Sequence, residues 1–184
     1  MKWLNEPDIW SENKNTFEIN SDPKTDFWRI THDNGVRDNG HFYHEKVSGN
    51  FEATVKITGN YKYLYDQAGL MVRSDHKNWL KCGIELVEDY QNISAVVTRN
   101  QSDWSKIPIK NRPEAVWMKL VRHHNDISVY FSLSGKNFEL FRQAYLDMSG
   151  EVMVGVMCAA PKGIGFKTTF EDLVIKQDNF VIFP

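Results

Sequence analysis

Short apolar runs separated by turn-forming residues dominate this chain, and they constrain its fold more than any other feature. The runs are rich in β-branched and aromatic residues and span 51–59, 68–74, 79–86, 93–100, 115–123, 126–133, 137–146, 151–159 and 165–175. Clusters of Gly, Asn, Asp, Ser and Pro lie between them, where tight turns need unusual backbone angles. No stretch keeps a helical period over a full helix length, although 60–66 and 145–149 suggest single helical turns. The pattern predicts an all-β sandwich or barrel.

The length of the chain predicts one domain over residues 1–184, since domains run to roughly 100–200 residues. Such a domain buries about 70% of its unfolded surface, so it needs no disulfide or metal to fold. Cys82 and Cys158 both lie in apolar runs, where buried free thiols are expected. The first forty residues are polar, and we expect them to wrap the sandwich as loops and an edge strand.

The overall charge limits the kinds of partner. With a net charge of −2 and a pI near 6.3, the chain has no excess of Lys and Arg for phosphates, so we expect no nucleic-acid partner. Its start lacks a signal-peptide pattern, and no apolar run reaches the length of a membrane span. We therefore expect no membrane partner and a cytoplasmic location.

Charged residues lie inside two of the predicted strands. Side chains alternate across a strand, so Lys81 and Glu85 share one face, opposite the apolar residues Leu80, Cys82 and Ile84. Consecutive strands are usually neighbours, which would bring Arg73, Lys81, Glu85 and Thr98 onto one half-polar face with Trp79 at its end. Two interpretations stay open, a ligand site or a solvated face with a weak cross-strand ion pair.

Two polar segments, expected to be loops, lie at the margin of this face. Residues 37–46 contain two histidines, and residues 100–108 contain Trp104, and polar loops with a tryptophan are common places for a ligand to bind. The spacing of His41 and His44 suits two metal ligands only on a helix, so we predict no metal site. The chain has no glycine-rich phosphate loop, G-x-S-x-G or H-E-x-x-H motif, so we predict no cofactor.

Several blocks of sequence occur in an order that resembles a known family. The blocks are DFWRITHDNGVRDNGHFYH, YDQAGLMVR, NWLKCGIEL, SAVVTRNQSDWS and GVMCAAPKGIGF. They resemble the uncharacterised "regulation of enolase" family, a domain of unknown function in the concanavalin A-like lectin/glucanase superfamily. The resemblance runs from about residue 10 to residue 175. It implies a jelly-roll sandwich of two antiparallel sheets, one of them concave, and in relatives a sugar usually lies on the concave sheet or at its rim.

The family's polar and aromatic positions, which include Asp26 and Trp28 here, largely coincide with the half-polar face and its margins. Taken together, the residues and the resemblance predict a ligand-binding set: Arg37, Asp38, His41, Asp66, Gln67, Arg73, Trp79, Lys81, Glu85, Thr98, Asp103 and Trp104.

Three functions follow from this set. The first is a non-catalytic protein that binds a carbohydrate or an acidic small molecule, with Trp79 and Trp104 stacking on it. The second is a hydrolase or lyase with Glu85 as acid or base and Lys81 tuning its pKa. The glucanase motif of two carboxylates on one strand is absent, so a pair would need Asp66 or Asp103.

The third function is a protein that binds and regulates a metabolic enzyme, as the family's name hints. A deep pocket around Glu85 with a raised pKa would favour the enzyme. A flat concave face, or one blocked by its own loops, would favour the regulator.

Overall fold

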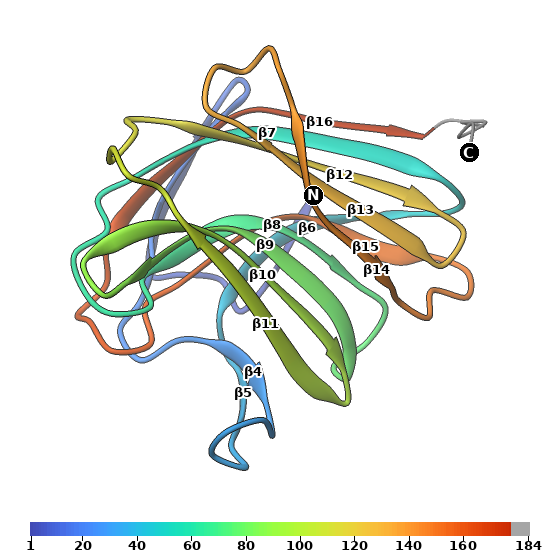
Figure 1. Cartoon of the computed structure of the whole chain (residues 1–184), viewed down its shortest axis with the longest axis horizontal. Helices are drawn as coiled ribbons and strands as arrows, with labels where there is room; N and C mark the ends of the chain where they lie inside the picture. The colour runs from blue at the N-terminus through green and yellow to red at the C-terminus, as the bar shows by residue number, and fades with distance from the viewer. Residues whose placement is uncertain (178–184) are drawn as a thin grey trace.

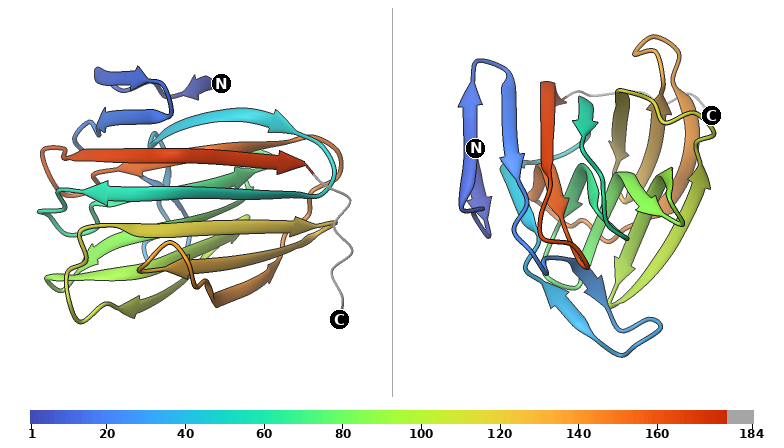
Figure 2. Two further views of the ribbon diagram at one scale, coloured as in Figure 1. Left: turned by 90° about the horizontal axis from the view of Figure 1, so that it is seen from above. Right: turned by 90° about the vertical axis from the view of Figure 1, so that its left-hand side faces the viewer.

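The computed structural model describes residues 1–177, which form a sandwich of two large antiparallel sheets (Figure 1). Residues 178–184, which the predicted domain includes, lie outside the described residues. Figure 2 shows the two layers from above and from the side. The all-β architecture predicted from the spacing of the apolar runs is confirmed.

Sheet A contains, in spatial order, β1 (Lys2–Leu4), β6 (His41–Val47), β15 (Val152–Ala159), β8 (Gln67–Arg73), β9 (Asn78–Val87), β10 (Tyr90–Arg99) and β11 (Gln101–Pro108). Sheet B contains β14 (Glu139–Tyr145), β13 (Asp126–Ser132), β12 (Val116–His123), β7 (Phe51–Gly59), β16 (Lys167–Gln177), β3 (Thr16–Asn20) and β2 (Ile9–Asn13). A separate pair, β4 (Phe27–Arg29) with β5 (Val36–Asp38), forms the β4–β5 hairpin.

Every apolar run predicted to be a strand is one, and the runs at 68–74, 79–86 and 93–100 lie side by side as β8, β9 and β10. Two expected loops were predicted wrongly. Most of 37–46 is β6, in the interior of sheet A, and 100–108 is the edge strand β11, whose polar residues suit an edge. Neither 60–66 nor 145–149 is helical, and no helix within residues 1–177 is long and apolar enough to cross a membrane.

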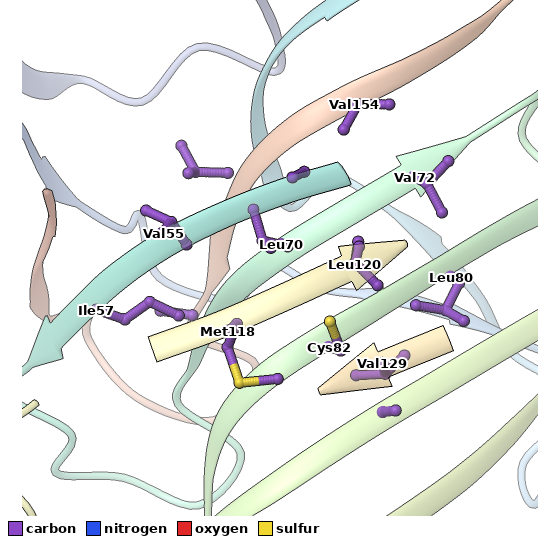
Figure 3. Close-up of a cluster of buried hydrophobic side chains, with 14 of the residues drawn as sticks. Val55, Ile57, Leu70, Val72, Leu80, Cys82, Met118, Leu120, Val129 and Val154 are labelled. Carbon is purple, nitrogen blue, oxygen red and sulfur yellow. The ribbon is translucent and has the colours of Figure 1, made fainter. Parts of the chain in front are cut away.

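The main core lies between the two sheets. Figure 3 shows Val55 and Ile57 of β7 facing Leu70 and Val72 of β8, with Met118 of β12 beside them, all buried. The face of β9 that was predicted to be apolar contributes to the same core. Cys82 and Cys158 are free thiols there, and burial raises the pKa of each thiol. The prediction that this face of β9 points inward, based on the alternation of side chains along a strand, is therefore confirmed.

A second apolar cluster lies on the outer face of sheet A, which points away from sheet B. The sheet curves over the β4–β5 hairpin on this side (Figure 1). The cluster, here called the outer cluster, consists of Phe27, Phe42, Met71, Trp79, Val96, Met157 and Ala159. The hairpin thus covers part of the face that was expected to be open. The polar part of this face, around Lys81 and Glu85, is largely buried and lines the opening beside the hairpin.

Two facing glycines let β8 and β9 pair under this polar part. Gly69 and Gly83 are register partners. A Cβ on Gly83 would lie 2.1 Å from the Ala68 carbonyl oxygen, and one on Gly69 would lie 1.8 Å from the Cys82 carbonyl oxygen, both closer than a real Cβ contact. Only glycine therefore fits at either position, and Gly83 leaves the surface between Lys81 and Glu85 free of any side chain.

We predict that Gly83→Ala destabilises the fold more than an ordinary glycine substitution, because the new methyl group forces β8 and β9 apart. Overpacking of this kind costs about 1–3 kcal/mol and occasionally more. Gly150→Ala is the control, since its Cβ would meet nothing within 4 Å and it carries only the strain of φ +84°. Urea unfolding measures both. A Gly83→Ala variant as stable as Gly150→Ala would contradict the steric account.

Candidate functional site

A cleft of about 1230 Å³ opens between the outer face of sheet A and the β4–β5 hairpin. Gln67, Lys81 and Glu85 line its floor, and Trp28 and its neighbours in the hairpin form one wall. Tyr65, from the turn before β8, and Trp104, from the edge strand β11, also line the cleft. The floor is polar because β8 and β9 turn their non-core face toward it.

Glu85 lies at the floor with its two carboxylate oxygens in different surroundings. Its side chain is nearly enclosed, with the residue 7% exposed. Oε2 accepts hydrogen bonds from Ser94 Oγ at 2.7 Å and from Trp104 Nε1 at 2.9 Å. Oε1 accepts none from residues 1–177, and it is not among the polar atoms sealed from solvent. The carboxylate is therefore fixed through one oxygen and presents the other to the cleft.

Burial raises the pKa of the Glu85 carboxyl above its ordinary value, because desolvation penalises the charged form. The positive charge of Lys81 and the hydrogen bonds from Ser94 and Trp104 oppose this rise. The negative charge of Asp26, which also lines the cleft, adds to it.

Lys81 connects the floor to the hairpin. Its Nζ donates to Gln67 Oε1 at 2.6 Å, to the Phe27 carbonyl oxygen at 2.7 Å and to Asp26 Oδ1 at 3.4 Å. An ammonium group has three protons, so these acceptors use all of them. The sequence predicted that Lys81 binds a ligand or tunes Glu85. In the structure it holds the hairpin wall against the sheet and also lies close enough to Glu85 to lower that pKa.

Further polar contacts fix the hairpin at both ends. Arg73 Nη1 and Nη2 donate to the two carboxylate oxygens of Asp38 at 2.5 and 2.8 Å. On the other side, the Arg29 backbone N–H donates to Ser102 Oγ at 2.9 Å, and Thr31 Oγ1 donates to the Ser102 carbonyl oxygen at 2.6 Å. The hairpin is thus tied to β8, β9 and the start of β11, which makes it a fixed wall of the cleft.

Two aromatic side chains, those of Trp104 and Tyr65, form a further part of the cleft wall. Trp104 is 37% exposed, and its ring meets that of Tyr65 edge-on, with centroids 6.3 Å apart and planes at 85°. Tyr65 has φ 69°, a left-handed conformation that is rare and strained for a bulky residue. The hydrogen bond from its backbone N–H to the Leu86 carbonyl oxygen, 2.7 Å, holds it there. Backbone strain is therefore retained at a position that places a ring beside the cleft.

Seven residues of the predicted set line the cleft: Arg37, Asp38, Gln67, Lys81, Glu85, Asp103 and Trp104. Four of them, Arg37, Asp38, Lys81 and Asp103, are engaged in ion pairs. Arg37 pairs with Asp33 within the hairpin, and Asp103 pairs with Arg142 of sheet B at 3.0 Å. Arg73 lies behind the hairpin, paired with Asp38.

Four other predicted residues lie away from the opening. The Trp79 ring is fully buried in the outer cluster, so it offers no face for stacking. Thr98 Oγ1 bonds to Ser102 Oγ at 2.8 Å beneath the hairpin. Asp66 is buried, and its Oδ2 accepts from the Lys62 and Tyr63 backbone N–H groups, closing a turn. Asp66 is therefore not a carboxylate partner for Glu85, and Asp26 lines the cleft instead.

His41 supports the N-terminal segment. Its Nδ1 lies 2.7 Å from the Asn5 carbonyl oxygen, and its Nε2 accepts from the Asp22 backbone N–H at 2.9 Å. Both ring nitrogens thus have protein partners. Among the described residues, no group of three or more His, Cys, Asp or Glu side chains is arranged to hold a metal ion.

Sequence reasoning missed Ser94, Ser102 and Tyr65 as parts of the site. A signal existed for Ser94. The turn at Glu88 and Asp89, both with positive φ, joins β9 to β10 by two residues, which fixes the register and pairs Ser94 with Gly83, on the face of Glu85. Tyr65 offered no comparable signal, because its position depends on the conformation of a turn.

We predict that Lys81→Met destabilises the protein by roughly 2–4 kcal/mol, because buried acceptors on the hairpin and on Gln67 lose their donor. Amide exchange of residues 27–38 should accelerate as the hairpin opens locally. Lys167→Met is the control, since it breaks an exposed pair with Glu18 that is worth at most about 1 kcal/mol. Equal effects of the two substitutions on urea unfolding would refute a bracing role for Lys81.

Comparison with known proteins places the chain among relatives of similar length. "Regulation of enolase protein 1" of Saccharomyces cerevisiae is 35% identical over 170 residues, covering 92% of this chain and 86% of that protein. A crystal structure of a functionally unknown protein from Saccharomyces cerevisiae matches with a TM-score of 0.93 and 34% identity, over 96% of both chains.

More distant solved structures share the fold alone. The carbohydrate binding module CBM66 from Bacillus subtilis has a TM-score of 0.62 at 14% identity over 95% of both chains. The GH43 protein BlXynB from Bacillus licheniformis has a TM-score of 0.68 at 18% identity, over 92% of this chain and 35% of that one. These likenesses identify the sandwich as a jelly roll, as the resemblance implied. The family model described as "Protein of unknown function (DUF1349)" matches residues 3–178, and the chain belongs to that family.

Proposed function

We propose that this protein binds a carbohydrate or a similar polar metabolite in the cleft between sheet A and the β4–β5 hairpin. The observation that carries the proposal is the surroundings of Glu85, a carboxylate with one oxygen fixed and one oxygen open at the floor of the cleft. A sugar offers hydroxyl donors for such an oxygen and apolar ring faces for the aromatic wall at Trp104.

Contacts within the protein hold the wall and the floor of the cleft. The hairpin is held by Lys81, Arg73 and Ser102, and the orientation of Glu85 is held by Ser94 and Trp104. Binding to a pre-organised site orders few side chains, so less of the interaction free energy is lost. The volume of about 1230 Å³ slightly exceeds the range of about 300–1,000 Å³ typical of small-molecule pockets. A ligand larger than one sugar ring therefore fits.

The comparisons are compatible with this proposal. CBM66 is described as a carbohydrate binding module, and it shares the fold of this chain over 95% of both lengths. Fold kinship does not transfer a ligand. The support for binding therefore comes from the cleft, and the neighbour supports only the suitability of the fold.

We predict that at least one member of a panel of neutral, amino, acidic and phosphorylated sugars raises the melting temperature. At a hundredfold excess over Kd, binding stabilises by about 2.7 kcal/mol, or roughly 5–10 °C for a domain of this size. Trp104→Ala should weaken binding at least tenfold, whereas Tyr145→Ala, an exposed ring on β14, should leave it unchanged. No shift with any sugar in the folded protein would refute the proposal and direct attention to a metabolic-enzyme partner.

A second candidate, catalysis on the same ligand, is favoured by the raised pKa of Glu85. A general acid in glycoside cleavage needs a carboxyl whose pKa lies above its ordinary value, and burial raises the pKa of Glu85 in this direction. The open Oε1 would carry the proton to the leaving group. Asp26, with one oxygen open to the same cleft, would be the second carboxylate. The pair comes from separate segments, which is why no strand motif shows it.

If Glu85 is a general acid, hydrolysis of aryl glycosides of a bound sugar should fall as pH rises through the raised pKa of Glu85. The protonated form is the active one and is lost in that window. Glu85→Gln should abolish the reaction. Glu88→Gln, on an exposed side chain just past β9, should keep it. A glycoside that binds but is not hydrolysed at any pH would contradict catalysis and leave binding intact.

A further inference from the structure

The charged groups around the cleft floor differ in how many of their donors and acceptors already have partners within the protein. All three protons of Lys81 are taken by protein acceptors. The guanidinium of Arg73 is paired with Asp38, and that of Arg37 is paired with Asp33. Lys81 and Arg73 are therefore committed to holding the structure, whereas Arg37 pairs only with Asp33 of the same hairpin and is 41% exposed.

Two further lysines line the cleft at its exposed edge, and they add little attraction for an anionic group at the floor. Lys24 and Lys162 are exposed, and Lys24 Nζ donates to the Lys162 carbonyl oxygen at 2.9 Å. Exposed charges are solvated and screened, so they contribute little to the discrimination of a ligand group held at the floor.

The carboxylates at the floor are only half used. Asp26 Oδ1 accepts from the Phe27 backbone N–H at 2.8 Å and from Lys81 and Gln67 at 3.4 Å, but its Oδ2 accepts nothing from residues 1–177. The Asp26 side chain is only 14% exposed. Glu85 repeats this arrangement, with Oε2 engaged and Oε1 open. The unused hydrogen-bonding capacity of the floor thus consists of acceptors that carry negative charge.

We infer that the ligand is a sugar without negative charge, which donates hydroxyl or amino protons to Glu85 Oε1 and Asp26 Oδ2. This rests on the proposed binding function and names its ligand class. Above the raised pKa of Glu85, a carboxylate or phosphate on the sugar would meet the negative charges of Glu85 and Asp26 in a poorly solvated site, with no donor of the floor free to receive it. The acidic small molecule, one of the two ligand classes expected from the sequence, is therefore disfavoured by how the charged groups of the cleft are paired.

Matched sugar sets test the inference by isothermal titration calorimetry. One set is glucose, glucosamine, glucuronate, glucose 1-phosphate and glucose 6-phosphate, and parallel sets are based on galactose and mannose. The expected result is that, in a set that binds, the neutral or amino member binds at least threefold tighter than every anionic member. An anionic member within threefold of its neutral parent, or tighter, overturns the inference but leaves the proposed binding function standing. No binding in any set overturns both.

A single substitution tests whether Glu85 sets this preference. In Glu85→Gln the amide oxygen should stay with the Ser94 and Trp104 donors, so the NH₂ group turns to the cleft and replaces an acceptor by a donor. The neutral member should then bind at least tenfold more weakly, and the ratio of anionic to neutral affinity should rise at least tenfold. Glu88→Gln makes the same change of charge outside the cleft and should keep the wild-type ratio. An unchanged ratio in Glu85→Gln, with thermal unfolding showing a folded variant, overturns the inference.

Discussion

The site depends on one buried ammonium group, that of Lys81. A buried cation is costly unless its protons are all bonded, and here the acceptors come from β8, from the start of the β4–β5 hairpin and from Asp26 beside it. Satisfying Lys81 therefore requires the hairpin to lie against sheet A. The hairpin in turn covers Trp79 and places Asp26 at the floor. A residue that the charge pattern marked as a ligand contact is instead the reason that a cleft exists.

Gly83 and Glu85 show how the floor is shaped from the same strand. Because no side chain fits at Gly83, the surface between Lys81 and Glu85 stays bare, and Ser94 of β10 can reach Glu85 Oε2 across it. Trp104 reaches the same oxygen from β11. The direction in which Glu85 presents its free oxygen is thus set by two neighbouring strands, and its raised pKa follows from the burial that this packing imposes.

The fold and the polar face were predictable because both follow from the way side chains alternate between the two faces of a strand. Leu80 and Ile84 pointing inward forces Lys81 and Glu85 outward, whatever the rest of the chain does. The covering of that face was not predictable. β4 and β5 have three residues each, too short to give a strand pattern, so the sequence held no sign that Phe27 would bury Trp79. Asp66 was misplaced for a related reason, since its role depends on the backbone of a turn.

The ligand preference of the cleft depends on which of its charged side chains already have partners in the protein, more than on which residues line it. Lysines, aspartates, Arg37 and Glu85 line the cleft together, and their identities alone are as compatible with an acidic ligand as with a neutral one. Hydrogen bonding separates the two cases, because each cation of the floor is used by the protein while Glu85 and Asp26 keep an open oxygen. Relatives that share the jelly roll at 14–18% identity need not share these pairings. The property that selects a ligand therefore lies in the contacts of the hairpin and β11 with the sheet, and the sandwich itself serves to hold them.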